Sequence, residues 1–107
     1  MFLFTGLGNP GQKYAMNRHN VGFMALDLLA ELYAFPPWQK KAASLQTTGQ
    51  INRNKIILLK PQSYMNNSGL PVAEVAQFHK VPVNNIFVFH DELDLASGRV
   101  RVKQGGG

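Results

Sequence analysis

The chain of 107 residues contains no cysteine, which excludes disulfide bonds and thiolate-bound metal ions. A cysteine-free chain also fits a reducing compartment, so we expect a cytoplasmic protein. No apolar run is long enough to cross a membrane. The opening apolar run, residues 1–4, is too short for a signal peptide and lacks a basic leader. We therefore expect no membrane among its partners.

Acidic residues are scarce, with six Asp and Glu against eleven Lys and Arg, so the formal net charge is +5. This excess of positive charge favours a polyanionic partner such as a nucleic acid. The hydrophobic fraction of 45% is that of an ordinary globular protein and argues against disorder. A chain of this length has room for one modest core, so we expect residues 1–107 to form a single domain.

Hydrophobic periodicity predicts strands that alternate with helices. The expected strands cover 2–6, 44–51, 55–60, 86–89 and 99–103. The expected helices cover 19–34 and 70–80, and 38–43 is expected to be an exposed connection. In the first helix, helical spacing predicts a buried face made of Val21, Met24, Ala25, Leu28 and Leu32. Asp27 and Glu31 are then expected on the opposite, solvated face.

The turn at Asn52–Asn54 joins its two strands too tightly for a parallel crossover, so these strands must be antiparallel. Ile56–Leu59 are all apolar, as in a strand covered on both faces. These patterns predict an α/β fold with a mixed, twisted sheet flanked by helices in three layers. In such sheets, ligands bind beyond the carboxyl ends of the parallel strands. Asn9 and Asp91 each follow a predicted strand, so both fall where this rule places chemistry.

The stretch Gly6–Gly11 matches the G-x-G-x-x-G pattern of dinucleotide-binding folds, and it follows a short apolar strand. However, Pro10–Tyr14 has the composition of a turn, and the helical pattern begins only after His19. A nicotinamide site also needs an acidic residue at the end of the second strand, whereas Asp27 lies inside the predicted helix. The glycines then shape a loop that holds Asn9 near His19, which suits hydrolysis. A nicotinamide-dependent oxidoreductase remains an alternative.

His19 and Asp91 are candidates for activating a water molecule. The positive end of the helix dipole disfavours the imidazolium form of His19 and helps to keep the ring neutral. A carboxylate bonded to the other ring nitrogen, such as that of Asp91, would orient the ring and stabilise the imidazolium. Asn9 and Asn66 carry amides that can donate to an oxyanion. Each residue also has a plain structural interpretation, because helix starts and turns commonly contain such side chains.

Three separated motifs occur in the chain: Gly6–Gly11 followed by Tyr14 and 18–20, then 61–69, then 90–94. Together they resemble the bacterial peptidyl-tRNA hydrolase family over the whole chain. The resemblance implies the fold of that family and hydrolysis of the ester bond between a peptidyl or N-acyl-aminoacyl group and the 3′ end of tRNA. This reaction recycles tRNA from stalled translation and rescues ribosomes. No metal and no organic cofactor is implied.

The resemblance also implies roles for individual residues. His19 would be the general base, Asp91 would orient it, and Asn9 would complete the catalytic set. The implied substrate-binding residues are Tyr14, Tyr64, Met65 and Asn66. Arg101 and Lys103 would lie toward the phosphates of the tRNA acceptor stem.

Family members continue past the glycines at 105–107 into a Gly/His/Asn stretch and further strands and helices. The resemblance therefore implies a domain truncated at its C-terminus, and we expect a monomer. The alternative is a catalytically silent fragment that only binds the tRNA acceptor end.

Overall fold

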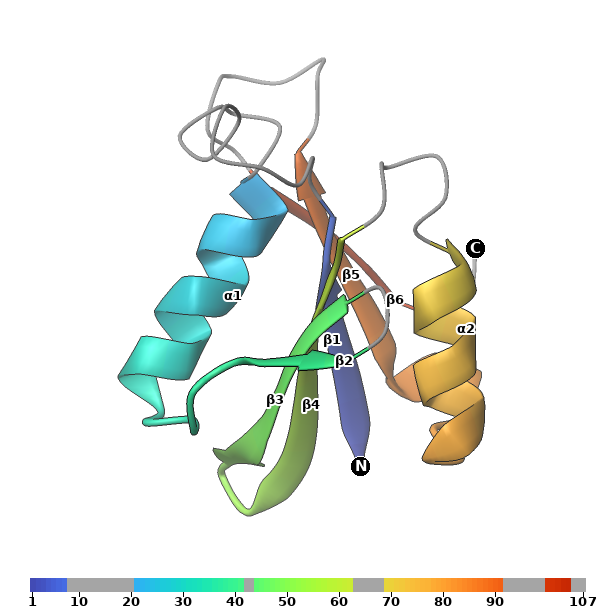
Figure 1. The fold of residues 1–107 in the computed structure, drawn as a ribbon, viewed down its shortest axis with the longest axis horizontal. Helices are drawn as coiled ribbons and strands as arrows, with labels where there is room; N and C mark the ends of the chain where they lie inside the picture. The colour runs from blue at the N-terminus through green and yellow to red at the C-terminus, as the bar shows by residue number, and fades with distance from the viewer. Residues whose placement is uncertain (8–20, 42–43, 63–68, 92–99, 105–107) are drawn as a thin grey trace.

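The computed structural model of the protein describes residues 1–7, 21–41, 44–62, 69–91 and 100–104 (Figure 1). Within these ranges the chain forms six β-strands, two α-helices and one short 3-10 helix, η4 (Val83–Asn85). The strands are β1 (Phe2–Gly6), β2 (Gln39–Lys41), β3 (Ser44–Ile51), β4 (Asn54–Pro61), β5 (Ile86–Asp91) and β6 (Val100–Gln104). The helices are α1 (Val21–Leu32) and α2 (Gly69–Phe78).

All of these strands belong to one sheet with the order β2-β3-β4-β1-β5-β6. The central strand β1 pairs in parallel with β4 on one side and with β5 on the other. The β2–β3, β3–β4 and β5–β6 pairs are antiparallel. The predicted mixed sheet is therefore confirmed, and so is the tight turn at Asn52 and Arg53 between two antiparallel strands.

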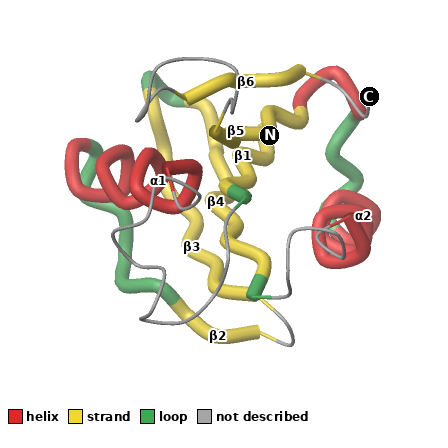
Figure 2. Tube along the Cα trace, turned by 90° about the horizontal axis from the view of Figure 1, so that it is seen from above, coloured by secondary structure: helices red, strands yellow, loops and turns green. Residues whose placement is uncertain are grey.

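The two helices cover opposite faces of the sheet, so the molecule has three layers (Figure 2). The residues of β4 divide alternately between two cores, as expected of a strand covered on both faces. Ile57 and Leu59 join the cluster that includes Val75 of α2. Ile56 and Leu58 join the cluster built around Leu26 of α1. The three-layer α/β prediction is confirmed.

The predicted buried face of the first helix is wrong at three of its five positions. Met24, Leu28 and Leu32 are 44%, 57% and 66% exposed, whereas Leu26 is completely buried. Leu29 packs against the same cluster as Leu26. Helix α1 carries apolar residues on more than one side, so the spacing alone admits two stripes. A close backbone contact at Gly22, described below, selects the stripe that faces the sheet.

Three boundaries also differ from the prediction. Within the expected connection at 38–43, Gln39–Lys41 form the short edge strand β2, because their backbone pairs with β3. Strand β5 continues through His90 to Asp91, because both residues pair with β6. Helix α1 ends at Leu32, since Ala34 adopts the left-handed conformation with φ 54°. Neither α1 nor α2 combines the length and the apolar character that a membrane span requires.

Candidate active site at the carboxyl edge of the sheet

The carboxyl ends of the three parallel strands meet at one edge of the sheet. Strand β1 ends at Gly6, β4 ends at Pro61 and β5 ends at Asp91. Helix α1 starts at the same end of the molecule, with its first turn beside the ends of β1 and β5 (Figure 1). This edge is where ligands bind in open α/β sheets, so it is the candidate site.

The start of α1 touches the ends of β1 and β5 through backbone atoms. A β-carbon at Gly22 would lie 2.3 Å from the carbonyl oxygen of Phe89 and 2.6 Å from that of Leu7. A β-carbon at Gly6 would lie 2.5 Å from the carbonyl oxygen of Gly22. The Leu7 amide donates a hydrogen bond to the Phe89 carbonyl oxygen at 2.9 Å. Glycine at both positions therefore lets the helix start rest directly on the strand ends.

Three of the predicted site residues lie on described strands. Asp91 is the last residue of β5 and pairs with Val100. On β6, Arg101 pairs with His90, and Lys103 pairs with Val88. The backbone therefore places Asp91 at the candidate edge and the two cations on the neighbouring strand.

The other predicted site residues lie outside the described residues: Asn9, Tyr14, His19, Tyr64, Met65 and Asn66. Their positions in the sequence nevertheless connect them to described elements. Asn9 comes two residues after Leu7, and His19 comes two residues before Val21. Tyr64, Met65 and Asn66 lie between the end of β4 and the start of α2.

A buried lysine lies close to this edge, and the sequence analysis missed its role. Lys60, next to the last residue of β4, is only 9% exposed. Its Nζ atom donates a hydrogen bond of 2.5 Å to Oδ1 of Asp27 on α1. The same Nζ atom lies 4.3 Å from the ring centroid of Trp38 and 5.8 Å from that of Phe23. A carboxylate and two aromatic faces thus surround this ammonium group.

Asp27 is 53% exposed, as expected for the solvated face of α1, but it is also paired with Lys60. This pairing weakens the nicotinamide alternative, since the acidic residue that alternative needs lies within α1 and is paired with Lys60. The sequence does contain one signal that Lys60 is paired. Lys60 ends an apolar run predicted to be covered on both faces, so its charge required a partner. Among the described residues, no group of three or more His, Asp or Glu could hold a metal ion.

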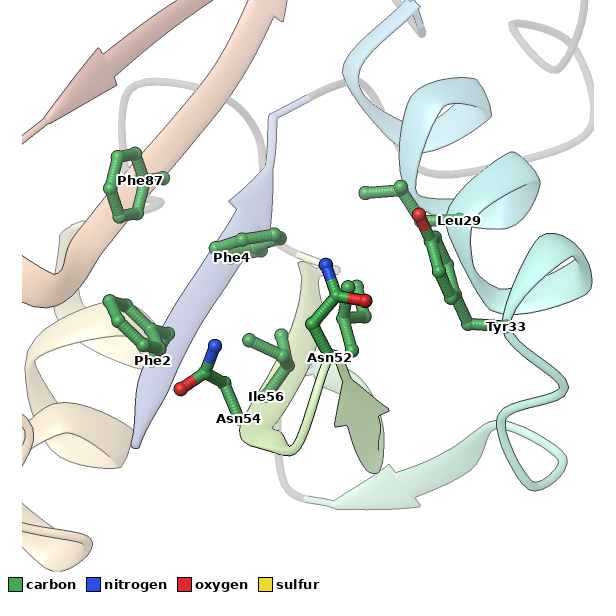
Figure 3. A pocket seen from close by; sticks show the side chains of 9 residues that line it. Phe2, Phe4, Leu29, Tyr33, Asn52, Asn54, Ile56 and Phe87 are labelled. Carbon is green, nitrogen blue, oxygen red and sulfur yellow. The ribbon is translucent and has the colours of Figure 1, made fainter.

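An apolar pocket lies at the opposite end of the sheet (Figure 3). It has a volume of about 310 Å³ and lies between the second half of α1 and the amino ends of β1, β4 and β5. Phe2, Phe4 and Phe87 form one wall, and Asn52 and Asn54 lie at its border. Because the parallel strands begin here, this pocket is separate from the candidate site.

Comparisons with known proteins agree on one family. A family model described as "Peptidyl-tRNA hydrolase" matches residues 3–107. The chain is 53% identical to a peptidyl-tRNA hydrolase of Azorhizobium caulinodans and 55% identical to one of Ruegeria pomeroyi, in both cases over all 107 residues. These matches cover 52% and 45% of the two relatives, so the chain spans about half the length of the curated relatives it matches.

The fold gives the same result. The crystal structure of peptidyl-tRNA hydrolase from Acinetobacter baumannii superposes with a TM-score of 0.89 at 38% sequence identity. The superposition covers 100% of this chain and 55% of that one. The motifs noted in the sequence, the three-layer fold and the match over residues 3–107 lead to one conclusion: the chain belongs to the peptidyl-tRNA hydrolase family.

Proposed function

We propose that the protein hydrolyses the ester bond between a peptidyl or N-acyl-aminoacyl group and the 3′ end of tRNA. This activity would recycle tRNA from stalled translation and would belong in the cytoplasm. The observation that carries the proposal is the family match over residues 3–107. The protein would act as a monomer and without a cofactor.

In the proposed mechanism, the imidazole of His19 removes a proton from a water molecule. The resulting hydroxide attacks the ester carbonyl carbon and forms a tetrahedral oxyanion. The Asp91 carboxylate orients the imidazole and stabilises its protonated form, and the amides of Asn9 and Asn66 donate hydrogen bonds to the oxyanion. The intermediate then collapses and breaks the bond to the ribose oxygen, which takes the proton from the imidazolium. The carboxylic acid product loses its proton to solvent, so the products are a free peptide carboxylate and tRNA.

Chain connectivity supports bringing these groups together. Leu7, Gly22 and Phe89 are in backbone contact at the carboxyl edge. Asn9, His19 and Asp91 are each only two or three residues from one of these contact points. Two or three residues of fully extended chain span about 7–11 Å at most. A base, its carboxylate partner and an amide donor can therefore meet at one substrate atom.

Charge supports the choice of substrate. The net charge of +5 suits the polyphosphate backbone of tRNA. Arg101 and Lys103 occupy alternate positions on β6, next to the strand that ends at Asp91. We propose that they bind acceptor-stem phosphates while the 3′ end lies at the carboxyl edge. Tyr14, Tyr64 and Met65 would contact the esterified amino acid and its peptide.

The test is release of the N-blocked amino acid from N-acyl-aminoacyl-tRNA by the protein and its variants. His19→Ala should lower kcat by about 10²–10⁴-fold, the usual contribution of a general base. Asp91→Asn should also lower kcat, and Asn66→Ala should cost about 10²–10³-fold through the lost oxyanion donor. His79→Ala is the matched control, because His79 is exposed at the far end of α2 and should leave kcat unchanged.

A His19→Ala variant with wild-type turnover would show that the proposed base is wrong. Salt-dependent tRNA binding without any turnover would instead support the alternative of a silent acceptor-end binder. Whether the protein is a hydrolase or only a binder of the acceptor end, Arg101→Ala or Lys103→Ala should weaken tRNA binding. Lys40→Ala, on the strand at the opposite edge of the sheet, is the charge-matched control.

A further inference from the structure

Lys60 occupies a position where the sheet otherwise presents apolar side chains. Ile56, Leu58 and Lys60 alternate along β4 and share the face that α1 covers. The first two pack in the cluster around Leu26. A lysine at the third position loses most of its hydration, which is costly unless the ammonium gains close partners. Its partners here are a carboxylate on α1 and the ring of Trp38.

The Lys60–Asp27 pair adds a directional attachment of α1 to the sheet, beside the packing of Leu26 and Leu29 in the core. At the start of the helix, Gly22 is in backbone contact with Leu7 and Phe89. Apolar packing is not directional, so by itself it tolerates small rotations and shifts of the helix. A hydrogen-bonded ion pair is directional, and Asp27 lies more than one turn further along α1 than Gly22. Together with the Gly22 contact and the core packing, the pair restricts the rotation and tilt of the helix.

Trp38 connects a third segment to this arrangement. After α1 the chain returns toward β2, and the Trp38 ring lies over the Lys60 ammonium. A cation held against an aromatic face gains attraction from the ring, most strongly where water is excluded. Strand β4, helix α1 and the segment between α1 and β2 are thus joined at one nitrogen atom.

We propose that the Lys60–Asp27 pair is a positioning pair, which holds the first turns of α1 at a fixed place over the carboxyl edge. This inference rests on the proposed function for its catalytic consequence. Helix α1 follows the proposed base, His19, and β4 leads into the proposed substrate-binding residues at 64–66. The pair therefore joins α1, which follows the proposed base, to β4, which leads into the proposed substrate-binding residues. A misplacement of about 1 Å between such groups can cost about 10²-fold in rate.

The variants are Lys60→Met, which keeps a long unbranched side chain, and Asp27→Asn, which keeps the shape of the acceptor. Matched controls are Lys55→Met on the exposed start of β4 and Glu31→Gln on the exposed side of α1. Lys60→Arg should keep nearly wild-type function, because it retains a cation that can bond Asp27 and stack on Trp38. Ile57→Val, on the α2 side of β4, controls for a general loss of stability.

The first measurement is amide hydrogen exchange, which requires no catalytic activity. In Lys60→Met and Asp27→Asn, we expect exchange to become at least tenfold faster for residues 25–28 and for the Leu7 amide bonded to Phe89. The amides of α2 should keep their protection. Unchanged exchange at residues 25–28 would overturn the proposal, even if the chain has no turnover.

The second measurement separates kcat from KM in the hydrolysis of N-acyl-aminoacyl-tRNA. We expect Lys60→Met to lower kcat at least tenfold while KM changes less than about threefold, with Ile57→Val near wild type. The Lys60→Met/Asp27→Asn double variant should lose no more than the more severe single variant, because both remove one interaction. A faster-exchanging α1 with unchanged kcat would overturn the positioning role. A wild-type protein without turnover would count against the proposed function only, and the exchange data would still decide on the pair.

Discussion

The β-carbon that Gly22 lacks would lie 2.3 Å from the carbonyl oxygen of Phe89. No side chain can be accommodated at that distance unless α1 moves away from the ends of β1 and β5. The nearest obstacles are backbone atoms of Phe89 and Leu7, which cannot move aside as a flexible side chain could. Gly22 therefore determines how closely α1, the helix that follows the proposed base His19, approaches β5, the strand that ends at Asp91.

Gly22→Ala should destabilise the protein although alanine is the better helix former. Helix propensity alone favours alanine by about 1 kcal/mol. The forced backbone shift should cost about 1–3 kcal/mol, so we expect a net loss of up to about 2 kcal/mol in urea unfolding together with reduced turnover. Glu31→Ala, at an exposed position of the same helix, should change stability by less than about 0.5 kcal/mol. A Gly22→Ala variant as stable and active as wild type would contradict the close contact.

Substitutions on α1 should report which face of the helix is buried. Leu26→Ala should lower the free energy of unfolding by about 2–5 kcal/mol, because the side chain is fully buried. Leu28→Ala should change it by no more than about 0.5 kcal/mol, because Leu28 is 57% exposed. Chemical denaturation of both variants measures the difference. If Leu28→Ala lowered the free energy of unfolding more than Leu26→Ala, the buried face would be the one predicted from the sequence.

Strand prediction succeeded for segments that are bounded by turn residues. The limits expected for 2–6 and 44–51 agree with β1 and β3, and the turn at Asn52 separates β3 from β4 as expected. The face of α1 was predicted incorrectly because two apolar stripes run along the helix. Choosing between them depends on the approach of Gly22 to Phe89, a contact between distant parts of the chain.

The candidate site could be predicted only in part, because sequence patterns do not show contacts between distant parts of the chain. The rule for parallel strands placed Asp91 at a strand end, and β5 does end there. The Lys60–Asp27 pair joins residues 33 positions apart, so neither helical nor strand periodicity can show it. The predicted roles of His19, Asn9, Tyr14, Tyr64, Met65 and Asn66 fall outside the described residues and stay predictions.

Glycine at the ends of both helices should stabilise the protein. Ala34 and Lys80 have φ values of 54° and 55°, and each follows a helix in the same hydrogen-bonded arrangement. The amide after each donates to a carbonyl in the last turn: Phe35 to Ala30, and Val81 to Ala76, both at 2.9 Å. This is the Schellman arrangement, in which glycine is the preferred residue.

We expect Ala34→Gly and Lys80→Gly each to raise the free energy of unfolding by about 0.5–1 kcal/mol. The relief of left-handed strain exceeds the entropy that glycine adds to the unfolded chain. Ala73→Gly, within α2, is the matched control and should lower stability by about 1 kcal/mol. Thermal unfolding of the three variants provides the measurement, and a loss of stability in both helix-end variants would contradict the assigned conformations.

The β3–β4 hairpin offers a similar test. Asn52 and Arg53 have φ values of 51° and 71°, as a type I′ turn requires, and Asn-Gly is the preferred pair in such turns. Arg53→Gly should therefore increase stability by about 0.5–1 kcal/mol. Lys55→Gly, two residues further along in β4, should decrease it by a similar amount, because glycine weakens a strand. Equal effects of Arg53→Gly and Lys55→Gly on the urea midpoint would contradict the type I′ conformation of the turn.

The central position of β1 has a consequence for synthesis on the ribosome. This strand is translated before β4 and β5, yet Leu3 pairs with Ile57 and Ile86 on those two strands, which emerge much later. Until then the nascent segment exposes Phe2 and Phe4 together with unpaired backbone groups, the features that attract chaperones and promote aggregation. Slower translation before β4 and β5 should therefore prolong the vulnerable interval and lower the yield of folded protein.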